Sequence, residues 1–146
     1  MKRQFLTLII LLLAPLLIFS GQDFDNAEFA ARRAAFMEQI PDGIAIILGA
    51  NTPTGDAHFF QTNDFYYFTG VEIPNSILII DGVNQESLIF YTLTEDGARG
   101  EGLPVELVTD PVKTTGIEKA NALDRFSSIL TRLSMQVPFI YTPYKP

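Results

Sequence analysis

Short runs of consecutive apolar residues alternate with segments of helical periodicity along this chain. Residues 44–48 and 76–80 are apolar runs rich in branched side chains, a composition typical of strands that are covered on both faces. Residues 87–92 predict a third strand, antiparallel to the second, because the turn-forming residues 81–85 separate the two. Residues 137–142 predict a final strand.

Two helices are expected between these strands. Asp25 is a suitable N-cap, and Glu28, three residues later, completes the pattern of a capping box. The helix that follows is expected to stop by Ile40, because the residue before a proline disfavours the helical region. Residues 120–133 predict a second helix, since one face carries apolar side chains at a 3,4,3 spacing: Leu123, Phe126, Leu130 and Leu133.

The segment between the third strand and the second helix has no sustained period. Residues 95–116 are rich in glycine, proline and acidic side chains, and we expect a long excursion with one helical turn near residues 105–107. The order of elements predicts an α/β fold of three layers, in which helices flank a mixed sheet.

A block of four adjacent aromatic residues, 65–68, stands between Asn63-Asp64 and Thr69-Gly70. It does not alternate as an amphipathic strand would. Aromatic side chains bury large areas, so this block is expected to serve the core and an interface between domains rather than a ligand site. An exposed apolar patch of more than a few hundred Å² would mark the face of a missing partner.

The first twenty residues have the pattern of a secretory signal peptide: a basic start, an apolar run over residues 5–19 and small residues at Ser20-Gly21. The alternative is an uncleaved membrane anchor, although the run is shorter than the roughly 17–25 residues that span a bilayer. We therefore predict a signal peptide over residues 1–20, one domain over residues 21–142, and the start of a linker at residues 143–146. The protein is expected to be exported, to the periplasm or the extracellular space.

The net charge and the composition limit the classes of partner that are expected. The net charge is −7, and it becomes −9 once Lys2 and Arg3 leave with the signal peptide. An acidic surface repels nucleic acid and anionic lipid, so neither is an expected partner, and membrane contact would require a retained leader. The chain has no cysteine, which excludes disulfides, zinc–cysteine sites and thiol catalysis.

Individual side chains offer little catalytic chemistry. His58 is the only histidine, and its nearest acid in sequence is Asp56, so the two are interpreted as loop residues rather than a metal site. No nucleophile elbow or phosphate-binding loop is present. We assign no catalytic, cofactor-binding or metal-binding residue to this chain. Arg32 and Arg33 are either solvated or, as a sharper hypothesis, one of them pairs with a carboxylate such as Asp64.

Several motifs occur in an order that resembles the N-terminal domain of Xaa-Pro aminopeptidases, also called aminopeptidase P, of the pita-bread (creatinase/prolidase) metallopeptidase superfamily. The resemblance covers roughly residues 27–141. It rests on the following motifs: Phe29-Ala30-Ala31-Arg32-Arg33, Ile40-Pro41-Asp42-Gly43, Gly49-Ala50, the block from Phe59 to Gly70, Ile73-Pro74-Asn75, Leu88-Ile89-Phe90 and Thr115-Gly116-Ile117. Two features depart from the family pattern. Phe60 replaces an arginine, and the loop over residues 95–102 lacks the usual aromatic residue.

The resemblance implies a fold with a ribonuclease H-like motif and a role without catalysis of its own. In the family, a larger C-terminal domain holds two manganese ions and removes the first residue from peptides with proline second. The N-terminal domain packs against that site and against neighbouring subunits, so the resemblance also implies a homo-oligomer. On this interpretation the chain is a fragment without the catalytic domain and carries no cofactor. Two alternatives remain: a stand-alone extracytoplasmic binding module that reuses the fold, and an unrelated exported α/β domain.

Overall fold

The structure, a computed structural model, describes residues 25–55 and 58–143. The predicted signal peptide, residues 1–20, lies outside the described residues, as does Asp56, and so do the last three positions of the predicted linker. Within the described ranges, no helix is long and apolar enough to cross a bilayer.

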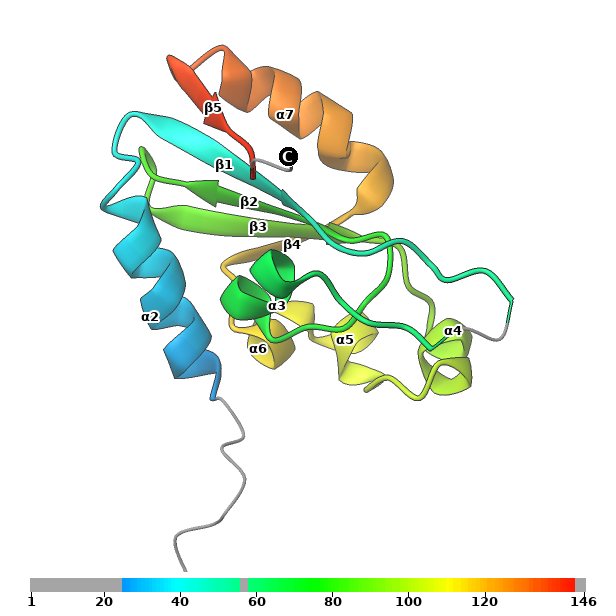
Figure 1. The fold of residues 1–146 in the computed structure, drawn as a ribbon. Helices are drawn as coiled ribbons and strands as arrows, with labels where there is room; N and C mark the ends of the chain where they lie inside the picture. The colour runs from blue at the N-terminus through cyan, green and yellow to red at the C-terminus, as the bar shows by residue number, and fades with distance from the viewer. Residues whose placement is uncertain (1–24, 56–57, 144–146) are drawn as a thin grey trace, which may run out of the picture.

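A mixed five-stranded sheet forms the centre of the domain, in the order β4-β3-β2-β1-β5 (Figure 1). The strands are β1 (Gly43–Leu48), β2 (Ile77–Asp81), β3 (Glu86–Tyr91), β4 (Lys119–Ala122) and β5 (Phe139–Tyr141). Strand β2 runs antiparallel to both β1 and β3, whereas β5 is parallel to β1 and β4 is parallel to β3. The predicted mixed sheet and the antiparallel pairing of the second and third strands are confirmed.

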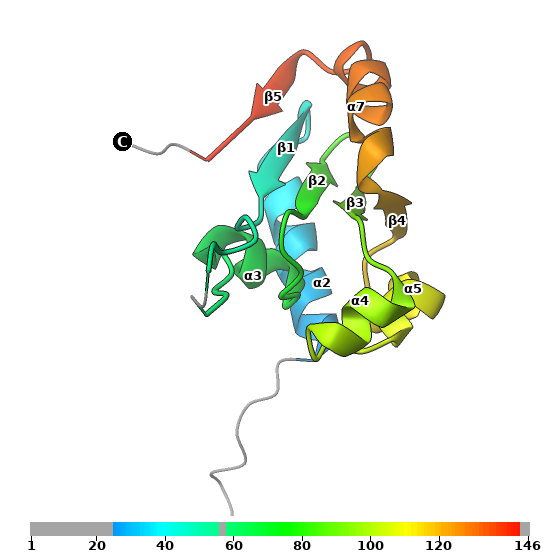
Figure 2. The same cartoon turned by 90° about the vertical axis from the view of Figure 1, so that its right-hand side faces the viewer.

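Helices cover both faces of this sheet, which confirms the three-layer prediction. Helix α7 lies on one face, and the other helices lie on the opposite side (Figures 1 and 2). The helices are α2 (Asn26–Met37), α3 (Asn63–Thr69), α4 (Glu95–Gly100), α5 (Glu106–Thr109), α6 (Pro111–Thr115) and α7 (Phe126–Ser134), with a 3-10 turn at Leu123–Arg125 before α7.

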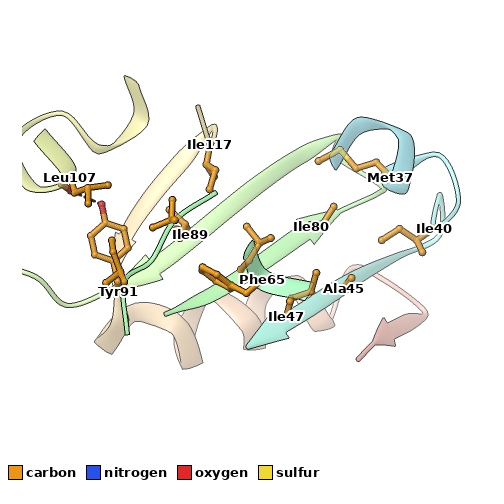
Figure 3. Packing of buried hydrophobic residues seen from close by; sticks show 13 residues of the cluster. Met37, Ile40, Ala45, Ile47, Phe65, Ile80, Ile89, Tyr91, Leu107 and Ile117 are labelled. Atoms are coloured by element: carbon orange, nitrogen blue, oxygen red, sulfur yellow. Dashed lines mark hydrogen bonds between the residues drawn. The ribbon is translucent and has the colours of Figure 1, made fainter. Parts of the chain in front are cut away.

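Each face of the sheet has its own apolar core. The larger core joins α2, α3 and α5 to the sheet; Phe65, Ile80 and Ile89 are fully buried in it (Figure 3). The smaller core lies under α7, where Leu133 packs with Phe90. Fully burying one such side chain contributes about 1.5–3 kcal/mol. The two cores account for the continuous apolar runs of β1 and β2, whose successive side chains point to opposite faces.

Helix α2 begins as the sequence predicts, but its capping differs. The Asp25 side chain accepts a hydrogen bond from the backbone N–H of Ala27, at 3.1 Å. Glu28 does not complete the capping box: its carboxylate forms an ion pair with Arg32, one turn further along the helix. A residue at position i+4 lies on the same face of a helix, so the charged guanidinium of Arg32 is within reach of the Glu28 carboxylate.

Three predictions about the second half of the chain are wrong in detail. The helix predicted over residues 120–133 starts only at Phe126, because residues 119–122 pair with β3 as strand β4. The excursion over residues 95–116 is largely helical: it forms α4, α5 and α6, of which only the turn at α5 was predicted. The last strand is confined to Phe139–Tyr141, shorter than residues 137–142.

Candidate functional site

The aromatic block forms helix α3. Phe65 and Thr69 face the core, whereas Tyr66 and Tyr67 are 40% and 51% exposed. The helix ends at Gly70, whose φ of 64° is the left-handed conformation that glycine adopts without strain. The block therefore divides between core and surface: Phe65 is buried, whereas the partly exposed rings of Tyr66 and Tyr67 pack against Phe29 and Phe68.

Arg33 connects helix α2 to the end of α3. Its side chain is 1% exposed, and its guanidinium donates to the carbonyl oxygens of Phe68, at 2.9 Å, and of Gly116. Glu118 lies 4.0 Å away, and its other oxygen accepts the backbone N–H of Ser87. Burial lowers the pKa of Arg33, and the charge of Glu118 opposes that shift. The guanidinium thus joins three segments that are far apart in the sequence.

Arg32 makes the matching connection at the surface. It donates to the carbonyl oxygen of Tyr67 at 3.0 Å, and its guanidinium lies 4.6 Å from the centre of the Tyr67 ring and 5.2 Å from that of Phe29. Such cation–π contacts contribute about 0.5–1 kcal/mol at exposed sites. Each arginine thus joins α2 to the aromatic block through a main-chain carbonyl, that of Tyr67 or of Phe68. The hypothesis that one of them pairs with Asp64 is wrong: among the described residues their ion pairs are with Glu28 and Glu118.

Gln61 organises the approach to α3, a role that sequence reasoning missed. Its carbonyl oxygen accepts the backbone N–H groups of Ala50, at 2.6 Å, and Thr62, at 2.9 Å. Its amide donates to the carbonyl oxygen of Ile73 at 3.1 Å. A single side chain therefore holds together the ends of the loop that leaves β1 and returns to β2. In the sequence, only the position of Gln61 just before the polar residues that open the block pointed to this role.

His58 lies exposed on a surface cavity of about 530 Å³, with Glu72 and Glu101 also on its wall. Within the described ranges, no three His, Asp or Glu side chains come together as metal ligands would. His58 lies in a loop, as the sequence predicts. The cavity brings together three titratable side chains from separate loops, but no metal-binding geometry.

Apolar side chains are exposed along the edge of the sheet formed by β5. All three of its residues are at least one-third exposed: Phe139 by 53%, Ile140 by 46% and Tyr141 by 37%. Leu48, at the end of the neighbouring β1, is 55% exposed. Exposed apolar side chains grouped on a strand edge are typical of surfaces that bind another protein or domain.

The family model described as "Aminopeptidase P, N-terminal domain" matches residues 29–141. A curated relative, Xaa-Pro aminopeptidase of Escherichia coli K12, is 26% identical over 130 residues, which cover 82% of this chain and 29% of the relative. The chain thus spans less than a third of the length of this relative.

Solved structures share the fold. Icp55 from Saccharomyces cerevisiae superposes with a TM-score of 0.68 at 20% identity, over 80% of this chain and 29% of Icp55. Aminopeptidase P from E. coli in a low-pH form gives 0.63 at 26% identity, over 77% and 27% of the two chains. The same E. coli enzyme with the inhibitor Pro-Leu gives 0.68 at 25% identity, over 83% and 29%.

Proposed function

Because the chain belongs to the family of aminopeptidase P N-terminal domains, we propose that it is the non-catalytic N-terminal domain of an exported Xaa-Pro aminopeptidase. In this role it packs against a catalytic domain, shapes the pocket for peptides with proline second, and contributes contacts to a homo-oligomer. The match over residues 29–141 is the observation that carries the proposal. The exposed side chains of β5 support it, since they offer an apolar surface for a second domain.

The side chains of the described residues are consistent with a metal site that lies in another domain. A catalytic metal site needs several converging carboxylate or imidazole ligands with an open position for water. The described ranges hold no such group, so the residues present do not fit manganese. We therefore assign manganese, and the hydrolysis that it supports, to a catalytic domain.

The test compares two polypeptides: the 146-residue chain and the product of the whole open reading frame that contains it. Both are incubated with manganese and a peptide with proline second, and release of the first residue is measured. We expect manganese-dependent release by the longer product and none by the 146 residues alone. Release by the 146 residues, or a longer product that leaves the peptide intact, would refute the proposal.

Export rests on the leader-like pattern of residues 1–20. Amino-terminal sequencing of the protein recovered from producing cells tests it: export predicts a mature protein that begins near Gly21, whereas an intact start at Met1 favours a retained membrane anchor. If the reading frame closes at Pro146, a stand-alone extracytoplasmic binding module becomes the preferred function.

A further inference from the structure

Strand β1 is longer than its neighbour β5, and among the described residues β5 pairs with only part of its edge. The parallel pairing of the two strands runs from Gly43 opposite Phe139 to Ala45 opposite Tyr141 and ends there. Strand β1 continues to Leu48. In a parallel ladder with this register, the next donor to the carbonyl of Ile46 would be the N–H of residue 143, which is a proline and has none. Pro143 therefore ends the pairing.

The backbone groups of this free stretch point outward from the sheet. The carbonyl of Gly43 accepts from Gly82 and the N–H of Gly49 donates to Ser76, so the odd-numbered residues of this segment face the β2 side. Even-numbered residues then face the β5 side, because successive residues of a strand alternate. The carbonyl of Leu48 accordingly takes a hydrogen bond from the Thr62 hydroxyl, at 2.9 Å. The carbonyl of Ile46 and the N–H of Leu48 face the same way.

A groove of about 510 Å³ runs along this free edge. Its walls are mainly apolar, from residues 46–48 of β1 and from Pro143, and they are completed by Thr142, Thr62 and Asp64. The Asp64 carboxylate is exposed and forms no ion pair within the described part of the chain. The groove thus combines a strand edge, apolar walls and one negative charge for which the described residues supply no counter-charge.

We propose that this groove binds an extended peptide segment of another polypeptide, which adds as a short strand beside residues 46–48 and places a lysine or arginine side chain next to Asp64. Strand addition supplies the main-chain hydrogen bonds, and alternate side chains supply the contacts with the walls. A basic peptide complements both Asp64 and the net charge of −7, whereas a second copy of this chain would bring like charge. The inference goes beyond the proposed function and does not require catalysis.

Fluorescence anisotropy of a labelled peptide, Lys-Thr-Val-Thr-Val-Thr with blocked ends, titrated with the 146-residue chain, tests this inference. Saturable binding is expected. A peptide that is N-methylated at every residue should not bind, because it lacks strand-forming N–H groups on both of its edges. Asp64→Asn should weaken binding by about 2–5-fold, the range of an exposed ion pair. Leu48→Lys should abolish it, whereas the control Val83→Lys, at a similarly exposed position on the β2–β3 turn, should leave it unchanged.

Circular dichroism establishes that each variant is folded before binding is measured, so a loss of affinity reports on the groove. Equal binding of the N-methylated peptide would overturn the strand-addition geometry. Equal binding by Leu48→Lys, or no binding by the unmodified chain, would overturn the site. Dimerisation of the chain that Leu48→Lys abolishes, without peptide binding, would also overturn the proposal and assign the edge to a second copy. None of these outcomes depends on peptide hydrolysis, so they are separable from a failure of the proposed function.

Discussion

Replacing Arg33 by alanine is the most informative perturbation of this fold. The side chain is 1% exposed and donates to two carbonyl oxygens, those of Phe68 and Gly116. An unsatisfied buried acceptor costs about 1–3 kcal/mol, and the space left by the side chain adds to this loss. The desolvation cost of the guanidinium is recovered at the same time. We therefore expect Arg33→Ala to lower the free energy of unfolding by about 3 kcal/mol.

Urea unfolding followed by circular dichroism measures this loss. Arg33→Lys should be intermediate, because a single ammonium group keeps the charge but lacks the planar fork that reaches both carbonyls. Arg99→Ala is the matched control: Arg99 is 57% exposed and pairs with Glu95 and Asp96 on its own helix, so its loss should be below about 0.5 kcal/mol. A decrease for Arg33→Ala no larger than that of Arg99→Ala would refute the view that Arg33 holds α2 to the aromatic helix.

Three further predictions concern other contacts. Gly70→Ala should lower the thermal stability of the domain far more than Gly55→Ala. Both glycines have positive φ, but only at Gly70 would the new methyl carbon lie 2.3 Å from the Phe29 ring. Equal losses of stability would contradict this packing. Burial raises the pKa of Tyr91 to about 12. The folded state therefore keeps the phenol proton that the unfolded state releases above the ordinary pKa of 10, so the free energy of unfolding should fall as pH rises from 10 to 12. Tyr91→Phe should weaken this dependence, and an unchanged profile would count against it. Arg33→Ala and Asp64→Ala should be additive within about 0.5 kcal/mol in a double-mutant cycle, since the two side chains do not pair; a larger coupling energy would restore the discarded ion pair.

The central strands β1 and β2 were predictable because their signal is local. Residues 44–48 and 76–80 are apolar on both faces, and each face packs against its own helical layer. The order of motifs also identified the family, which the match over residues 29–141 confirms. For these strands the local pattern of apolar residues agrees with the tertiary structure, so the local pattern alone was enough to predict them.

Strand β4 could not be predicted in the same way. Its sequence, Lys119-Ala120-Asn121-Ala122, is poor in the branched and aromatic side chains that favour strands. It is a strand because β3 offers an edge to pair with, which is a long-range condition. The apolar spacing of the following helix extends back to Leu123, and this made the two segments look like one helix.

The partner of Arg33 was missed for a related reason. A charged side chain in a sequence suggests an opposite charge, so Asp64 was the natural choice. In the structure Arg33 donates to main-chain carbonyls at the end of α3 and before β4. Every residue has such a carbonyl, so the residue types in the sequence do not reveal these partners. Gln61 was overlooked likewise, because its partners are the N–H and carbonyl groups of Ala50, Thr62 and Ile73.

We propose that these 146 residues form a docking and shaping domain whose reactive machinery belongs to a separate catalytic domain. Manganese content after equilibrium dialysis, measured by mass spectrometry on the 146-residue chain, tests it most directly. The chain should retain no more manganese than an equally acidic control protein. Stoichiometric manganese that resists dialysis would contradict it, because the metal ligands would then lie within this chain.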